Sequence, residues 1–114
     1  KIDKVLNKLN EDTIIIVKTE IEGMLEKQYI DDSDEYAAFK LAYWYEKFSP
    51  EIDLEKSYLW YSVAVSSGNY KAMKLRDRVG ESLENEILLE LQKEAFDIFT
   101  KQKYLKESKS GDSL

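Results

Sequence analysis

The chain has 114 residues, of which 43% are hydrophobic and 35% are charged, a mixture typical of one soluble globular domain with a single core. It contains no cysteine and no histidine. These two absences exclude disulfides, zinc sites built on thiolate or imidazole, and nucleophiles activated by a histidine.

The 17 basic and 23 acidic residues leave a formal net charge of -6. This charge argues against a nucleic-acid partner, because affinity for phosphates rests on Lys and Arg. It suits a basic protein partner, although a merely solvated acidic surface is the alternative. The longest aliphatic run, Ile14 to Val17, is too short to span a membrane. Because the chain begins at Lys1 rather than Met, we expect that a preceding segment such as a secretion signal has been removed, which leaves a periplasmic and a cytoplasmic location in a bacterium both open.

Few glycines and a single proline favour an all-helical fold. The first predicted helix covers about Asp3 to Tyr29. Its expected buried stripe, at spacings of three and four, consists of Ile14, Val17, Ile21, Met24, Leu25 and Gln28. The β-branched run Thr13 to Val17 is the one place where a strand competes with this helix.

The acidic stretch Asp31 to Glu35 leads into a second predicted helix, Tyr36 to Phe48. Ser33 or Asp34 is expected to cap its first turn. A calcium-binding loop is a more specific alternative for this stretch. However, the alternation of ligand residues is incomplete, and the glycine at which such a loop turns is missing. The expected buried face consists of Ala37, Leu41, Trp44, Tyr45 and Phe48.

Pro50 breaks the pattern, and Asp53 is expected to cap a third helix that ends at Ser66 before Gly68-Asn69. Its expected buried stripe consists of Leu54, Ser57, Tyr58, Tyr61, Ala64 and Val65, with Trp60 partly exposed.

A fourth helix is predicted from Tyr70 to Val79, with Ala72, Leu75 and Val79 inward and Gly80 at its end. Ser82 is expected to cap a long final helix, and the polar tail 106–114 is expected to fray. The face of this last helix is predicted to consist of Leu88, Leu91, Ala95, Ile98 and Gln102.

One hexapeptide recurs in the chain. Tyr36 to Leu41 (YAAFKL) returns as Tyr70 to Leu75 (YKAMKL), an offset of 34 residues that equals the period of tetratricopeptide repeats. The segments Leu41-Ala42-x-x-Tyr45, Asp53-x-x-Lys56-Ser57-x-x-Trp60-Tyr61-x-x-Ala64 and Gly68-Asn69-x-x-Ala72 lie within and between the copies. Together they resemble the Sel-like repeat, a branch of the tetratricopeptide superfamily.

The resemblance covers about residues 35–99 and implies a short α-solenoid of antiparallel helix pairs. Ala42 stands where the family has glycine, Ser57 stands where it has alanine, and the loop before Asp53 lacks the family's glycines. The expected organisation is an N-terminal helical cap (1–33), a Sel-like region with a closing helix (34–105) and a flexible tail (106–114). Single repeats cannot bury their faces alone, so both flanking helices are expected to complete the core.

The resemblance implies a protein-binding function without cofactor, metal or catalytic residues. Within the family, small bacterial members include immunity proteins that neutralise a secreted toxin, so a basic toxin domain is one expected partner. Tyrosines in equivalent repeat positions and their neighbours form the candidate binding surface. This surface consists of Tyr36, Lys40, Tyr43, Tyr70, Lys74 and Asp77.

Two other functions stay open at this stage. The chain is compatible with a scaffold segment cut from a longer repeat array. A carboxylate-based enzyme is disfavoured, because acid-base work at neutral pH most often uses histidine. The carboxylates that such an enzyme would draw on, more simply explained as a solvated helix face, are Glu81, Glu84, Glu86, Glu90 and Glu94.

Overall fold

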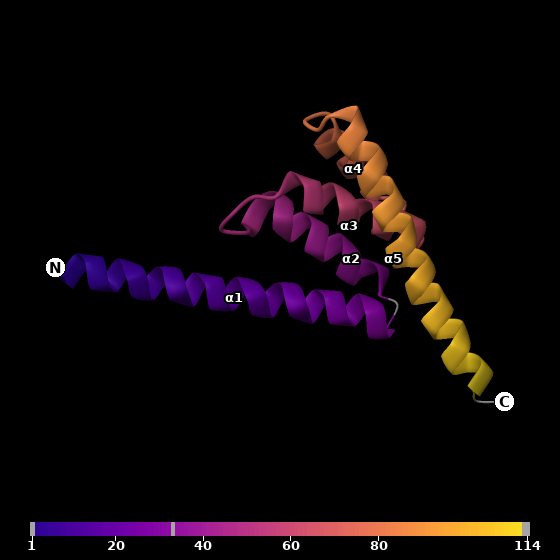
Figure 1. Cartoon of the computed structure of the whole chain (residues 1–114), viewed down its shortest axis with the longest axis horizontal. Helices are drawn as coiled ribbons and strands as arrows, with labels where there is room; N and C mark the ends of the chain where they lie inside the picture. Colours follow the sequence, from indigo (N-terminus) through magenta and orange to yellow (C-terminus); the bar gives the residue numbers. More distant parts are fainter. Residues whose placement is uncertain (1, 33, 113–114) are drawn as a thin grey trace.

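The computed structural model describes residues 2–32 and 34–112, and these residues are helical with short connections (Figure 1). The elements are α1 (Ile2–Asp32), α2 (Glu35–Tyr43), the π-helix η1 (Trp44–Phe48), α3 (Leu54–Ser66), α4 (Ala72–Gly80) and α5 (Asn85–Asp112). The predicted all-α class is confirmed for this part of the chain. Thr13 to Val17 lies within α1, so the competing strand does not form.

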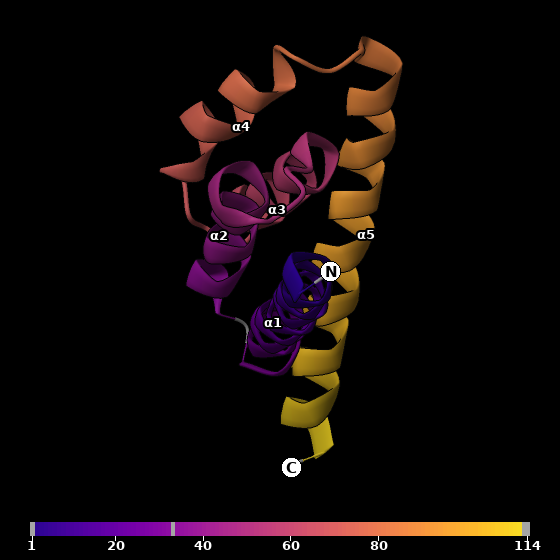
Figure 2. The same cartoon turned by 90° about the vertical axis from the view of Figure 1, so that its left-hand side faces the viewer.

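Helix α3 is the centre of the core. It packs against α2, α4 and α5, while α1 packs against α2 (Figure 2). Every residue from Ser57 to Ala64 is buried, on all sides of the helix. A helix that is apolar all round must be surrounded by other elements, and the neighbours of α3 provide that cover.

The ends of the α2–α3 hairpin follow the local signals in the sequence. The Asp34 side chain accepts a hydrogen bond from the Tyr36 amide at 2.9 Å, and Asp53 accepts one from the Lys56 amide at 3.0 Å. Gly68 follows α3 with a φ of 106°, a conformation that favours glycine. These three predictions are confirmed, whereas Ser33 lies outside the described residues.

Two positions that depart from the Sel-like pattern contact each other between α2 and α3. The Ser57 hydroxyl donates a hydrogen bond to the Ala42 carbonyl at 2.9 Å, and both residues are fully buried. A buried hydroxyl must find an acceptor, and this carbonyl provides one within the hairpin. The serine at position 57 is therefore tolerated in the core, because the carbonyl of Ala42 accepts its hydrogen bond.

The π-helical turn changes which residues face the core after Tyr45. The Ser49 amide donates to the Trp44 carbonyl at 2.7 Å, a bond spanning five residues instead of four. The wider turn rotates the next residues by about one position. As a result Phe48 is 62% exposed and Ser49 is buried, so the prediction that Phe48 belongs to the buried face is wrong.

Among the described side chains of α1, the buried contacts with the body come from its second half. Leu25 and Tyr29 are buried and Ile21 is half-buried, at spacings of four residues. Towards its N-terminus α1 diverges from α2 and projects away from the other helices (Figure 1). The predicted stripe is wrong at three of its members, which are exposed in the structure. They are Ile14, Val17 and Met24.

Trp60 is buried, with 6% of its surface exposed, which corrects the expectation that it is partly exposed. Trp60 contacts Tyr29 of α1 in an edge-to-face arrangement, with ring centroids 5.9 Å apart. Sequence periodicity places Trp60 on one side of α3, but it cannot show that the last turns of α1 cover that side. Trp60 therefore joins α1 to the core.

The predicted inward face of α5 is confirmed: Leu91, Ala95 and Gln102 are buried, and Leu88 and Ile98 are half-buried. The two ends of this helix differ from the predictions. It begins at Asn85, three residues after Ser82, because the chain first turns through residues 81–83, so Ser82 is not its cap.

At the other end α5 continues to Asp112, past Lys106, where we expected the tail to fray. The last residues, 113–114, lie outside the described part of the chain. None of the helices within residues 2–32 and 34–112 is both long enough and apolar enough to cross a membrane.

Candidate functional site

The structure places all six predicted binding residues on the surface, but it does not gather them into one patch. Tyr36 and Tyr70 are 59% and 71% exposed, and both line a hollow of about 290 Å³ beside the turn at Gly68. The repeat-equivalent tyrosines are therefore brought together. Lys40, Lys74 and Asp77 are exposed but do not line this hollow.

Tyr43 belongs to a separate aromatic cluster at the end of α2. Its ring stacks on Phe39, with centroids 6.4 Å apart, and meets Phe48 at 5.4 Å. Phe39 in turn contacts the buried ring of Tyr61 at 5.7 Å. Tyr43 is thus anchored to the core through Phe39, with its outer side exposed.

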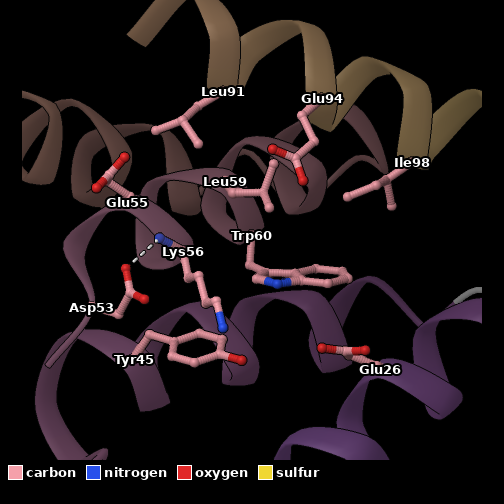
Figure 3. A pocket seen from close by; sticks show the side chains of 10 residues that line it. All are labelled: Glu26, Tyr45, Asp53, Glu55, Lys56, Leu59, Trp60, Leu91, Glu94 and Ile98. Carbon is pink, nitrogen blue, oxygen red and sulfur yellow. Dashed lines mark hydrogen bonds between the residues drawn. The ribbon is translucent and has the colours of Figure 1, made fainter. Parts of the chain in front are cut away.

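A cleft lies between α1, η1, α3 and α5, and sequence reasoning did not identify it (Figure 3). It has a volume of about 410 Å³. Its apolar and aromatic lining consists of Tyr45, Leu59, Trp60, Leu91 and Ile98. Its charged lining consists of Glu26, Asp53, Glu55, Lys56 and Glu94. Glu26 and Glu94 approach it from opposite sides, from α1 and α5.

The charges of the cleft are unbalanced. Within the described part of the chain, none of its four carboxylates forms a salt bridge. The Lys56 ammonium lies 5.4 Å from the centre of the Tyr45 ring. Burial raises the pKa of the Glu26 carboxyl, the charge of Glu22 raises it further, and Lys56 opposes both. The cleft therefore has a surplus of negative charge next to apolar surface.

Glu22 of α1 holds the aromatic wall of the cleft in place. Its carboxylate accepts hydrogen bonds from the Tyr45 hydroxyl at 2.6 Å and the Trp44 indole at 3.2 Å, and pairs with Lys18 at 2.8 Å. Burial alone would raise the pKa of Glu22, but the hydrogen bonds from Lys18, Tyr45 and Trp44 outweigh it and lower that pKa. Glu22 therefore links α1 to η1 as an ionised group.

We expect Glu22→Ala to lower the free energy of unfolding by about 2–3 kcal/mol at neutral pH, because it leaves the nearly buried Tyr45 hydroxyl without its acceptor. The pKa of Glu22 is depressed in the folded state, so its stabilising contribution is present above its unfolded value of about 4.3. That contribution is lost as the pH falls through the folded pKa. The difference from wild type should shrink below about pH 4, as measured by urea unfolding.

Glu20→Ala is the matched control for this prediction, since Glu20 lies on the same helix and is exposed. It should change the free energy of unfolding by less than about 0.5 kcal/mol. Equal effects at positions 20 and 22 would show that the network around Tyr45 does not stabilise the protein.

The carboxylates considered for acid-base chemistry are exposed in the structure, as expected of a solvated face. Of these, Glu94 lines the cleft. Among the described residues there is no group of three or more Asp and Glu side chains arranged to hold a metal ion. This finding also applies to the described part of the acidic stretch before α2. Asp34 there serves as a helix cap.

The cleft was missed because its residues are distant in sequence. Glu26 lies on α1 and Glu94 on α5, and only the folded arrangement of these two helices brings both to the cleft. The local signal within α1 is the carboxylate of Glu26. That signal does not show what lies opposite.

Comparison with protein-family models, with curated proteins and with solved structures finds no match to this chain. The Sel-like resemblance therefore rests on the motifs in the sequence alone.

Proposed function

We propose that the chain is a non-enzymatic protein-binding module of the Sel-like type. In this proposal α2–α3 is the full helix pair of a short solenoid, α4 is the first helix of a degenerate second repeat, and α1 and α5 act as caps. The repeated Tyr-x-Ala-x-Lys-Leu motif at Tyr36 and Tyr70 supports the pairing, as does the packing of α3 between α2 and α4. Such arrays use exposed helix faces to bind other proteins.

The observation that carries the proposal is the hollow between Tyr36 and Tyr70. These two tyrosines occupy equivalent positions of the repeat, remain largely exposed and line one concavity. Tyrosine is favoured at protein interfaces because it combines a large contact area with a polar tip and few rotamers. An ordinary surface gives no reason for two repeat-equivalent tyrosines to converge.

The partner we propose is a secreted toxin that this chain neutralises as an immunity protein, with a basic domain that complements the net charge of -6. The test is co-purification with a toxin domain encoded by the neighbouring gene, followed by titration calorimetry. The double variant Tyr36→Ala/Tyr70→Ala should weaken binding at least about tenfold, since two interface tyrosines are lost.

Tyr104→Ala is the control, because Tyr104 is equally exposed but lies far along α5. It should leave the affinity unchanged within about twofold. Absence of a complex with any neighbouring toxin would reject the immunity proposal. A complex that is insensitive to the double variant would reject this surface.

A second candidate is a scaffold segment of a longer repeat array. It is favoured by one observation: the consecutive residues Ile14 to Val17 are all exposed on the projecting part of α1. Four apolar residues in a row point to all sides of a helix, and a preceding repeat would cover them. The full-length reading frame distinguishes the two candidates, because only the scaffold requires further repeats before α1.

A further inference from the structure

Two hollows adjoin between α1 and α5. The first is the acid-lined cleft of Figure 3. The second, of about 220 Å³, is lined by Ile30, Ile98, Lys101, Gln102 and Leu105. Ile98 lines both, and we call the two hollows together the α1–α5 groove.

The two walls of the α1–α5 groove differ in length, because α1 crosses α5 instead of running alongside it (Figures 1 and 2). On α1, Glu26 and Ile30 are four residues apart and share a face. On α5, the groove extends from Leu91 to Leu105, which corresponds to about 21 Å of helix. The α5 wall is therefore long enough for about four turns of a guest helix, more than a compact small molecule would occupy.

The groove changes in character along its length. At one end four carboxylates and one ammonium line the groove together with Trp60 and Leu59 (Figure 3). At the other end, Ile30 and Leu105 are exposed apolar side chains. A lysine or arginine suits the first end, because its aliphatic stem can cover apolar surface while its charge meets the carboxylates. An apolar side chain suits the second.

We infer that the α1–α5 groove binds an amphipathic helical segment of a partner protein. A Lys or Arg side chain of that segment occupies the acid-lined end, and a neighbouring apolar side chain occupies the hollow at Ile30 and Leu105. The inference rests on the proposed function as a protein-binding module but concerns a different surface from the Tyr36–Tyr70 hollow.

Charge decides between a basic partner and a second copy of this chain. A second copy would bring a further net charge of -6 to a cleft that already has unpaired carboxylates. Like charges brought together at an interface cost several kcal/mol, whereas a basic guest neutralises them and is drawn in by the same field. Burial and the charge of Glu22 raise the pKa of Glu26 more than Lys56 lowers it, so a further cation from a guest would be favourable there.

The test uses a synthetic helical peptide of about 15 residues, composed of Leu, Lys and Ala with leucines on one face and lysines beside them. Its affinity is measured by titration calorimetry, and its position is mapped by backbone amide chemical shifts. We expect binding with shifts along the facing sides of α1 and α5. A peptide with Glu in place of each Lys should bind at least about tenfold more weakly.

Two matched pairs of variants locate the site. Glu94→Lys should weaken peptide binding at least about tenfold, while Glu90→Lys, the same charge change at an exposed position on the same helix, should change it by less than about threefold. Ile30→Ser should weaken binding at least about threefold, and Leu89→Ser, also exposed but outside the groove, should not.

Equal effects of Glu94→Lys and Glu90→Lys would overturn the inference, because the attraction would then be a general property of an acidic protein. The absence of peptide binding would also overturn the inference. So would a dimer, detected by sedimentation, in which a second copy of the chain fills the groove. These failures are separable from that of the proposed function, since the Tyr36→Ala/Tyr70→Ala variant tests the other surface against the toxin.

Discussion

Deleting residues 84–114 is expected to abolish cooperative thermal unfolding. The deletion removes α5, which packs directly on α3. Its lost apolar contacts come from Ile87, Leu88, Leu91, Ala95 and Ile98. At about 1.5–3 kcal/mol for each large buried side chain, the loss is on the order of 10 kcal/mol, comparable with the whole stability of a domain this size.

Circular dichroism during heating measures this effect. The shortened chain should show a broad, low-temperature decline, while the full chain shows one sharp transition. The Gln92 amide, which donates to the Tyr58 hydroxyl at 2.9 Å, would also be missing, leaving Tyr58 of α3 uncovered.

Deletion of residues 106–114 alone is the control. The described side chains at Lys106 and Glu107 are exposed, so this shorter deletion should leave the transition midpoint within a few degrees of the full chain. If residues 1–83 melt cooperatively near the midpoint of the full chain, α5 is not needed to complete the core.

Local signals predicted the α2–α3 hairpin well. Asp34, Asp53 and Gly68 act through hydrogen bonds and backbone conformation within a few residues of themselves, so the sequence alone shows their effect. The inward face of α5 was predictable for a similar reason, because one regular stripe meets one partner helix.

Other features depended on information that is not local. The π-helical turn at Trp44–Phe48 has no marker such as proline or glycine, and it moved Phe48 out of the core. Periodicity predicted a stripe on α1 but not where the helix diverges from its neighbour, so Ile14 and Val17 were placed in the core and are exposed.

The candidate surfaces likewise include one that a local sequence pattern indicated and one that it did not. The recurring hexapeptide drew attention to Tyr36 and Tyr70 together, and both line one hollow in the structure. The α1–α5 groove brings residues near position 26 together with residues near position 94, and no pattern in one helix reports its distance from another. The acidic character of the groove was visible only as the overall net charge.

Replacing Tyr61 is expected to destabilise the fold strongly. Tyr61 is fully buried in α3, its ring contacts Phe39, and its hydroxyl donates to Glu46 at 2.8 Å. Tyr61→Ala should lower the free energy of unfolding by about 3–5 kcal/mol, because it empties a site at the centre of the core. Urea unfolding at neutral pH measures this loss.

Tyr61→Phe separates the ring from the hydroxyl. It keeps the packing and should cost about 1–2 kcal/mol, since Glu46 loses one donor but keeps its pairing with Arg78. Losses of the same size for alanine and phenylalanine would show that the hydroxyl, and not the ring, carries the contribution of this residue.

The contribution of the Tyr61 hydroxyl also depends on pH in a defined direction. Burial raises the pKa of Tyr61, and its hydrogen bond to the Glu46 carboxylate raises it further. The folded state therefore holds this proton more tightly than the unfolded state, whose tyrosine pKa is about 10. The stabilisation that the protonated hydroxyl provides is fully present below about pH 10 and decreases as the pH rises above that value. Tyr61→Phe has no such proton, so its difference from wild type should narrow above pH 10, and a constant difference up to pH 11 would contradict the role of the hydroxyl.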